Sequence, residues 1–128
     1  MNQEKIGSEL FYDTYALYAI ATGKESYFSF LKGYKINTSL LNLYEFYYIL
    51  AKENQIDIAE AFFNRLINNC LGFNSDNIKE AAKFRLKNIK KKFSYLDCLG
   101  YIVAKNNNMK FLTGDDAFNG FENVEFVK

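Results

Sequence analysis

Short apolar runs alternate with longer helical segments along most of the chain, and this alternation restricts the fold more than any other feature. Strand character is expected at 8–12, 34–37, 70–73, 110–113 and 124–127. Helices are expected between these runs, at 14–23, 24–32, 39–54, 57–69, 75–92 and from 94 onward. Strands separated by helices pair in parallel, and the helices cover both faces of the sheet. The sequence therefore predicts an α/β fold around a central, mainly parallel sheet of four to five strands.

Residues that cap helices mark several of these boundaries. Thr38 or Ser39 is expected to cap the third helix, Ser75 the fifth and Ser94 the last. Asp97 follows Ser94 by three residues, which resembles a capping box with Asp in place of Glu. Gly100 lies inside that last helix, where glycine costs about 1 kcal/mol relative to alanine, so we expect close packing against the sheet there.

Length and composition indicate one ordinary globular domain that covers residues 1–128. The chain is 49% hydrophobic and 24% charged, with a net charge of +1, so any basic surface for nucleic acid must be local. The segment Met1–Glu9 is polar and lacks the apolar core of a signal peptide. The longest apolar stretch, near 40–51, contains Asn42 and Glu45 and is too short to span a bilayer. We therefore expect a cytoplasmic protein with no membrane partner.

The chain contains no histidine. This excludes Ser-His-Asp and Cys-His nucleophilic sites, imidazole acid–base chemistry and His-ligated zinc. The two cysteines, Cys70 and Cys98, are too few for a four-thiolate zinc site and are expected to be buried thiols. The chemistry that remains for catalysis is mostly that of carboxylates, hydroxyls and amines.

Four acidic residues lie where the strand ends of a parallel sheet would meet. Asp13 and Asp115 follow apolar runs, Glu45 interrupts one, and Asp97 opens the last helix. In open α/β sheets, ligands bind beyond the carboxyl ends of the strands. Carboxylates that converge there repel one another and raise each other's pKa. A hard divalent cation such as Mg²⁺ or Mn²⁺, which prefers oxygen ligands, would favour keeping such a cluster.

Each acid also has a structural interpretation. Asp13 is equally suited to cap the helix that follows it, and the helix dipole favours Asp97 in a first turn whatever its function. Glu45 is the only charged residue from Ser39 to Ala51, in a helix so apolar that we expect it to be largely buried. A buried carboxylate must be neutralised, paired or metal-bound. The alternatives for Glu45 are an ion pair or exposure at a gap in burial.

Two adjacent carboxylates, Asp115 and Asp116, follow the run at 110–113. At a strand–helix junction, one of them can cap the helix while the other acts as a ligand. Thr113 supplies a hydroxyl beside them, and Phe118 is expected to anchor the turn in the core.

Four segments together resemble the PIN domain family, and most closely the VapC-type toxin nucleases. They are Phe11-Tyr12-Asp13-Thr14, the helix that carries Glu45, Ser94-Tyr95-Leu96-Asp97-Cys98-Leu99-Gly100-Tyr101, and Phe111-Leu112-Thr113-Gly114-Asp115-Asp116-Ala117-Phe118. None is specific alone, but their order and spacing match the family from Leu10 to the C-terminus.

The resemblance implies a three-layer α/β/α sandwich with metal-dependent endoribonuclease activity. It assigns Asp13, Glu45, Asp97 and Asp115 as catalytic residues that hold one or two Mg²⁺ or Mn²⁺ ions. Asp116 is either a further ligand or only a helix cap. The hydroxyls of Thr14, Ser94 and Thr113 would support the ligands. The resemblance also implies a homodimer that is neutralised by a small antitoxin protein.

Basic residues crowd the segment before Asp97. They are Lys79, Lys83, Arg85, Lys87, Lys90, Lys91 and Lys92. As an RNA-binding flank this segment would include Arg85, the strongest phosphate candidate, and Lys90, Lys91 and Lys92. The alternative is a solvated helix face.

Two other functions remain to be considered. A phosphoacceptor receiver domain needs a second acid beside Asp13, an Asp at the end of a strand and a Lys near the end of another; Asp57 lies in a helical segment and Lys110 begins a strand. A catalytically silent PIN-type module that binds RNA or protein is the other alternative, and the complete set of four acids argues against it.

Overall fold

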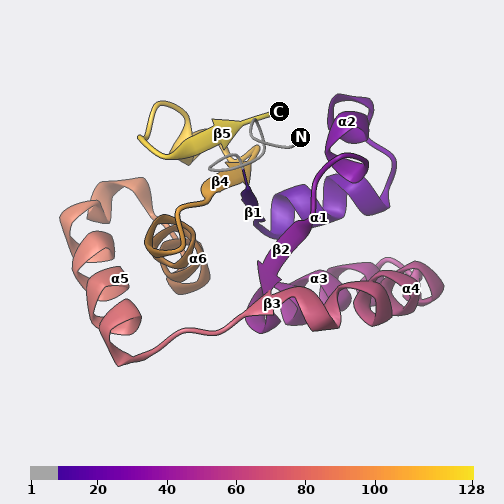
Figure 1. Cartoon of the computed structure of the whole chain (residues 1–128), viewed down its shortest axis with the longest axis horizontal. Coiled ribbons are helices and arrows are strands. Elements are labelled where there is room, and N and C mark those ends of the chain that lie inside the picture. Colours follow the sequence, from indigo (N-terminus) through magenta and orange to yellow (C-terminus); the bar gives the residue numbers. More distant parts are fainter. Residues whose placement is uncertain (1–8) are drawn as a thin grey trace, which may run out of the picture.

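The structure of the chain is a computed structural model that describes residues 9–128. The expected strand start at Ser8 and the polar stretch 1–8 lie outside the described residues. Five parallel strands form one sheet in the order β3-β2-β1-β4-β5 (Figure 1). The strands are β1 (Leu10–Tyr12), β2 (Ile36–Ser39), β3 (Cys70–Leu71), β4 (Lys110–Thr113) and β5 (Val124–Phe126). The predicted parallel α/β fold is confirmed.

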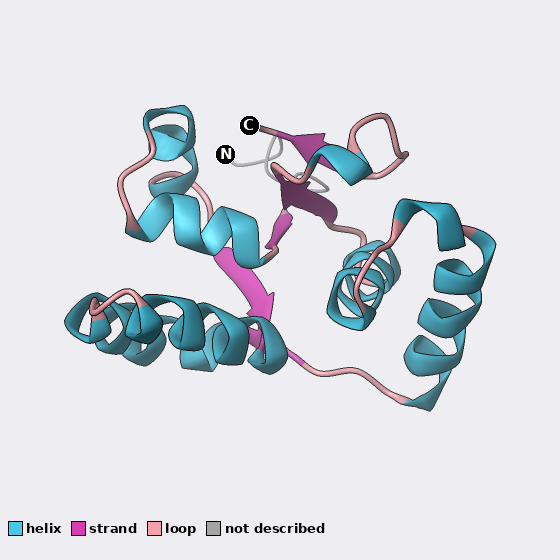
Figure 2. Ribbon diagram, turned by 180° about the vertical axis from the view of Figure 1, so that it is seen from behind, coloured by secondary structure: helices cyan, strands magenta, loops and turns pink. Residues whose placement is uncertain are grey.

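Helices lie on both sides of this sheet. They are α1 (Thr14–Ala21), α2 (Phe28–Leu31), α3 (Leu40–Lys52), α4 (Ile56–Leu66), α5 (Ser75–Lys87) and α6 (Tyr95–Asn106). Short 3₁₀ turns accompany them within residues 9–128: η2 (Glu25–Tyr27), η3 (Ile67–Asn69), η4 (Ile89–Lys91) and η5 (Asp116–Phe118). In Figure 2, α1 to α4 lie on one side of the strands and α5 and α6 on the other. No helix among residues 9–128 combines the length and hydropathy needed to cross a bilayer.

Alternate residues of the central strands supply two hydrophobic cores. Leu10, Tyr12 and Leu112 pack with α1, α3 and α4 in one buried cluster. Phe11 and Phe111 pack on the opposite face with α6, and their rings stack with centroids 5.9 Å apart. Successive side chains of a strand point to opposite faces, so three-residue strands are enough to separate the two cores.

Gly100 allows α6 to lie directly on the sheet. A Cβ atom at this position would be 3.2 Å from ring carbons of both Phe11 and Phe111. The expected close packing of this glycine is confirmed, and it brings the first turn of α6 near the ends of β1 and β4.

The second strand lies two residues later than predicted, at Ile36–Ser39 instead of 34–37. The sequence pattern did not reveal this strand, because three of its four residues are polar. The Asn37 and Thr38 side chains are buried in the sheet and form hydrogen bonds there. The Asn37 amide donates to the Leu10 carbonyl (3.1 Å) and the Thr38 hydroxyl donates to the Tyr12 carbonyl (2.8 Å). These side-chain bonds link β2 to β1 in addition to the backbone pairing of the two strands.

The fifth helix differs from the prediction at both ends. Asn74, not Ser75, is its N-cap and exchanges hydrogen bonds with Asn77. The helix ends at Lys87 instead of 92, because the Asn88 side chain bonds to the Phe84 carbonyl. The chain then forms η4 and turns at Lys92, whose φ is 60°. At the other predicted caps, Ser39 begins α3 and Ser94 begins α6.

The prediction that α3 is buried almost all round is wrong. Leu43, Phe46 and Leu50 are fully buried, but Leu40, Tyr44 and Tyr48 are 54%, 72% and 60% exposed. Glu45 lies on the exposed side as well. The helix is therefore one-sided, and its outer face carries apolar and aromatic groups that sequence periodicity alone assigns to a core.

Candidate active site

The carboxyl ends of β1 and β4 open into a pocket of about 580 Å³. All four predicted catalytic carboxylates line it, from four different segments: Asp13 after β1, Glu45 on α3, Asp97 on α6 and Asp115 after β4. The other lining residues are Thr14, Tyr15, Tyr18, Ile49, Glu53, Gly114, Asp116 and Lys128. Parallel pairing explains this convergence, because it places the ends of β1 and β4 at one edge.

Asp13 is the most deeply buried of these acids, with 5% of its surface exposed. It caps α1, because its Oδ1 accepts a hydrogen bond from the Ala16 amide at 2.9 Å. The cap and the pocket-lining interpretations of this residue are therefore both correct. Burial raises the pKa of Asp13 to about 7, against the opposing effect of its hydrogen bonds, and the charges of Asp97 and Asp115 add to the increase.

Thr113 connects two of the acids. Its hydroxyl donates to the Asp13 carboxylate and accepts from the Asp115 amide at 3.1 Å. The Thr113 side chain is fully buried. Thr113 therefore fixes the position of Asp115 relative to Asp13.

Asp97 is held by the capping box predicted from the sequence. The Ser94 hydroxyl accepts from the Asp97 amide (3.0 Å), and the Asp97 Oδ2 accepts from the Ser94 amide (2.9 Å). Burial is the main cause that raises the Asp97 pKa, and the charges of Asp115 and Glu45 act in the same direction. The bonds from Ser94 act in the opposite direction. Ser94 thus orients this carboxylate and stabilises its charged form.

A polar contact between helices brings Glu45 to the pocket. The Ser39 hydroxyl donates to the Asn42 Oδ1 at 2.6 Å, and the Asn42 amide donates to the Thr14 hydroxyl at 3.1 Å. All three side chains are buried. Glu45 lies three residues after Asn42, on the same side of α3. Glu45 therefore reaches the pocket from an exposed position, and the premise that it is buried is wrong.

The two adjacent acids after β4 have different roles. Asp115 caps the turn η5 by accepting from the Ala117 amide at 3.0 Å. Asp116 is exposed and forms an ion pair with the Lys128 Nζ at 2.7 Å. Asp116 is therefore not the helix cap, and a lysine already holds its Oδ2. Phe118 is fully buried, which confirms its predicted anchoring role.

The donor atoms around the pocket fit a hard divalent cation. They are carboxylate oxygens, which such cations prefer. Burial is the main cause that raises the pKa of Asp13 and Asp97, and repulsion from the neighbouring acids adds to it. Within residues 9–128, no three Asp, Glu, Cys or His side chains lie close enough to form a complete ligand set. The four carboxylates therefore line one pocket without forming a complete ligand set in this structure.

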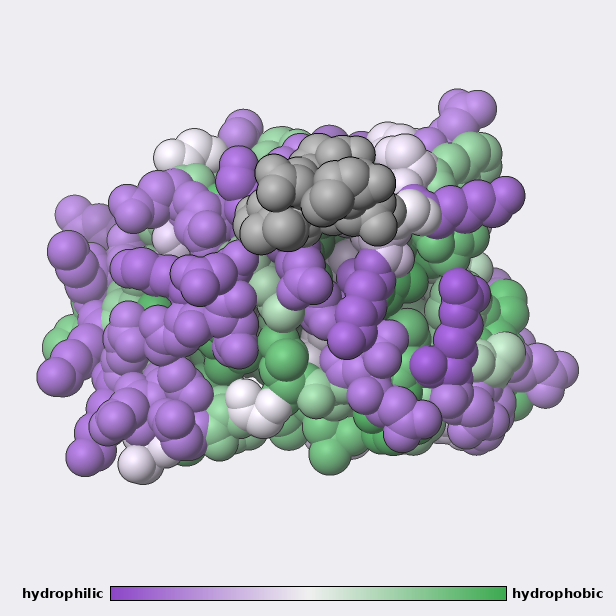
Figure 3. All heavy atoms as spheres, viewed as in Figure 1, coloured by the Kyte–Doolittle hydropathy of each residue, from purple (hydrophilic) through white to green (hydrophobic). Residues whose placement is uncertain are grey.

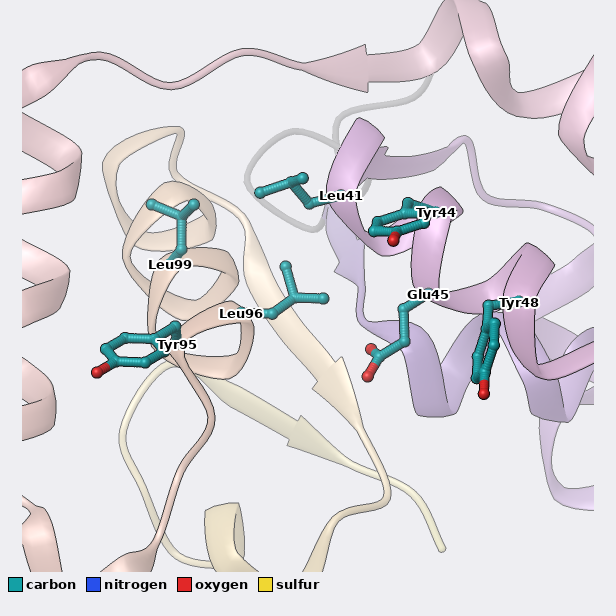
Figure 4. Close-up of a pocket in the computed structure, with 7 residues that line it drawn as sticks. All are labelled: Leu41, Tyr44, Glu45, Tyr48, Tyr95, Leu96 and Leu99. Carbon is teal, nitrogen blue, oxygen red and sulfur yellow. The ribbon is translucent and has the colours of Figure 1, made fainter.

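An apolar cleft of about 470 Å³ adjoins the acidic pocket and shares Glu45 with it. The cleft is lined by Leu41, Tyr44, Glu45 and Tyr48 of α3 and by Tyr95, Leu96 and Leu99 of α6 (Figure 4). Glu45 and Leu96 point into the space between the helices, whereas the Tyr95 ring points away from α3. Tyr44 and Tyr48 are therefore exposed aromatic residues that line a cleft beside the acidic pocket.

The basic segment lies apart from the acidic pocket. Arg85 and Lys90 to Lys92 are absent from the lining of that pocket. Arg85 donates from Nε to the Phe93 carbonyl at 2.9 Å, and its guanidinium lies 4.2 Å from the Tyr95 ring centre. Lys91 lies over the Phe121 ring. The side of the molecule that carries α5 is strongly hydrophilic in Figure 3. Through its bond to the Phe93 carbonyl and its contact with the Tyr95 ring, Arg85 also joins α5 to the start of α6.

Sequence reasoning missed several residues of the pocket. Tyr15 and Tyr18 lie three residues apart on α1, just after Asp13, and this spacing was a usable signal for a shared helix face. Glu53 accepts a hydrogen bond from the Tyr18 hydroxyl at 2.7 Å. Lys128 had no signal in the sequence, because only the pairing of β5 with β4 brings it to the pocket.

A family model for the PIN domain matches residues 10–124. A chain in a toxin–antitoxin complex from Klebsiella pneumoniae is similar in structure, with a TM-score of 0.74 and 17% identity over 91% of this chain and 96% of that one. VapC20 of Mycobacterium tuberculosis, a toxin that cleaves the sarcin-ricin loop, has a TM-score of 0.71 and 18% identity over 91% and 99%. A Pyrobaculum aerophilum protein has a TM-score of 0.63 and 18% identity over 93% and 90%. No curated protein matches in sequence.

Proposed function

Because the chain belongs to the PIN domain family, we propose that it is a metal-dependent endoribonuclease that hydrolyses phosphodiester bonds in RNA. The observation that carries this proposal is the convergence of four carboxylates, from four segments, on one pocket beyond the ends of β1 and β4. The fold shared with VapC20, whose described activity is cleavage of the sarcin-ricin loop, supports RNA as the substrate.

Asp13, Asp97 and Asp115 would hold one or two Mg²⁺ or Mn²⁺ ions, with Glu45 as a direct or water-mediated ligand. Such an ion supplies charge stabilisation at the phosphate and a more acidic water. Thr113 keeps Asp13 and Asp115 in register, and Ser94 orients Asp97. Thr14 acts through Asn42 on the position of α3. Asp116 is the weakest candidate ligand, because Lys128 holds its Oδ2.

The RNA strand would continue from the pocket along the basic segment, where Lys90, Lys91 and Lys92 are exposed and Arg85 is partly buried. Binding through these residues would be sensitive to salt, because phosphate contacts release counterions. Replacing the three lysines with Ser would then weaken RNA binding and flatten its salt dependence. Unchanged binding would assign the segment to solvation.

We further propose that the chain is the toxin of a toxin–antitoxin pair, that it forms a homodimer and that a small antitoxin neutralises it. The Klebsiella pneumoniae complex and VapC20 support this role by fold. The exposed apolar cleft between α3 and α6 supports a protein partner, because it presents Leu41, Tyr44 and Tyr48 beside the acidic pocket.

The experiment that tests the activity is cleavage of a mixed RNA panel by the purified chain with Mn²⁺. The matched control is Asp97→Asn, which retains an oxygen that can accept from the Ser94 amide. We expect cleavage that requires both the metal and Asp97. Equal background from the two folded proteins would contradict the nuclease and favour the alternative, a catalytically silent PIN module.

A further inference from the structure

Lys128 is the only cationic side chain among the described residues that line the acidic pocket. Six carboxylates share that lining: Asp13, Glu45, Glu53, Asp97, Asp115 and Asp116. The Lys128 Nζ lies 2.7 Å from the Asp116 Oδ2, and the Asp115 charge also acts on the lysine. A single positive charge thus lies at the margin of a strongly negative site.

The backbone that carries Lys128 is held to the site at several points. The Val127 amide donates to the Thr113 carbonyl at 2.9 Å. The hydroxyls of Tyr27 and Ser26 donate to the carbonyls of Val127 (2.6 Å) and Lys128 (2.8 Å). A Cβ atom at Gly114 would lie 2.6 Å from the Val127 carbonyl oxygen, so only glycine allows this approach. The lysine is therefore positioned by the fold.

The contact between Lys128 and Asp116 can be exchanged at little cost. The two side chains are 58% and 76% exposed, and ion pairs with that exposure add little to stability. A phosphate that approaches six carboxylates meets repulsion, and an ammonium group at the margin of the pocket offsets part of it through a charge-assisted hydrogen bond.

We propose that Lys128 binds a phosphate group of the RNA strand at the entrance of the acidic pocket. As the strand enters, the Nζ exchanges the Asp116 carboxylate for a phosphate oxygen. Asp116 therefore positions the lysine in the free protein and is not a metal ligand. This inference rests on the proposed function and adds a residue that touches the substrate.

The test compares Lys128→Gln and Lys128→Arg with Lys105→Gln, an exposed lysine of α6 that does not line the acidic pocket. On an RNA that the native chain cleaves with Mn²⁺, Lys128→Gln should raise KM about tenfold with little change in kcat, as for the loss of one charged hydrogen bond. Lys128→Arg should retain most of the affinity, and Lys105→Gln should match the native chain.

Binding of the same RNA is measured in the inactive Asp97→Asn background at several salt concentrations. Adding Lys128→Gln should make the negative slope of log K against log salt shallower by about 0.7, the value for one phosphate contact on a single strand. Adding Lys105→Gln should not. This readout reports phosphate contact and would not change if Lys128 only supported the fold.

The outcomes separate this inference from the proposed function. Cleavage with an unchanged KM and salt slope in Lys128→Gln overturns the role of Lys128 and leaves the nuclease intact. RNA binding without cleavage by the native chain contradicts the proposed nuclease activity. The salt dependence of binding then still tests whether Lys128 contacts a phosphate. Absence of RNA binding overturns both. Asp116→Asn should lower cleavage only slightly. Complete loss of cleavage in this variant would indicate that Asp116 is a metal ligand instead.

Discussion

Asp13 combines two roles that make opposite demands on its charge. As the cap of α1 it accepts from the Ala16 amide, which favours the carboxylate. As a buried group beside other acids it resists ionisation, so its pKa rises to about 7. At neutral pH a proton therefore partly neutralises the site, in the place where a cation would bind.

This shift predicts how the metal-free protein responds to pH. The pKa of Asp13 is higher in the folded state than the ordinary aspartate value of 3.8, so the folded chain binds more protons than the unfolded chain between about pH 4 and 7. Folding stability should then fall as pH rises through this range and level off above it. We expect thermal melts in EDTA to show this decline.

Asp13→Asn removes the charge and keeps an oxygen for the cap. We expect the metal-free variant to be more stable than the native chain at pH 8, by about 1–3 kcal/mol, because no buried carboxylate must ionise. Its pH dependence should be shallower, although Asp97 still contributes. The same variant should not cleave RNA. Equal stability of the two proteins at pH 8 would show that ionising the buried Asp13 carboxylate does not destabilise the fold.

At the scale of elements, the first turn of α6 determines both helix stability and the position of a carboxylate. The Ser94–Asp97 capping box satisfies two backbone amides that the helix start leaves without partners. Gly100, one turn further, seats the same helix on Phe11 and Phe111. Together these two short features fix where Asp97 meets the pocket.

Ser94→Ala should therefore affect stability and activity together. We expect a loss of about 1 kcal/mol in the free energy of unfolding, which is typical for the loss of a cap. Cleavage should fall as well, because Asp97 loses the hydroxyl that holds its own amide. Urea denaturation and initial rates measure the two effects. Ser94→Thr is the matched control that keeps the hydroxyl, and equal losses in both variants would exclude the cap as the cause.

At the scale of the whole molecule, occupation of the acidic pocket should be coupled to stability. An ion that binds only the folded state raises stability by about 2.7 kcal/mol at a hundred times its Kd. Millimolar Mn²⁺ should thus raise the Tm of the native chain by several degrees and leave Asp13→Asn nearly unchanged. No shift in the native chain would count heavily against the metal site.

The apolar cleft between α3 and α6 should control assembly. Tyr44→Ser with Tyr48→Ser removes two exposed rings from it without touching the buried side of α3. We expect the native chain to sediment as the proposed dimer, and the double variant to fold normally and to sediment as a monomer. Ile78→Ser, which changes another exposed apolar residue, on α5, is the matched control. A double variant that remains dimeric would place the interface elsewhere.

The order of residues along the chain was sufficient for much of this structure. Apolar runs separated by helical segments predicted the parallel sheet, and Ser94 with Asp97 predicted a capping box, because both patterns depend on near neighbours. The four acids could be located because each closes or interrupts a local apolar pattern.

The exposed face of α3 and the burial of Asn37 and Thr38 could not be predicted in the same way. Their environments depend on segments far away in the sequence, as does the arrival of Lys128 at the pocket through β5. Periodicity records which residues share a face, and only the tertiary packing decides whether that face is covered.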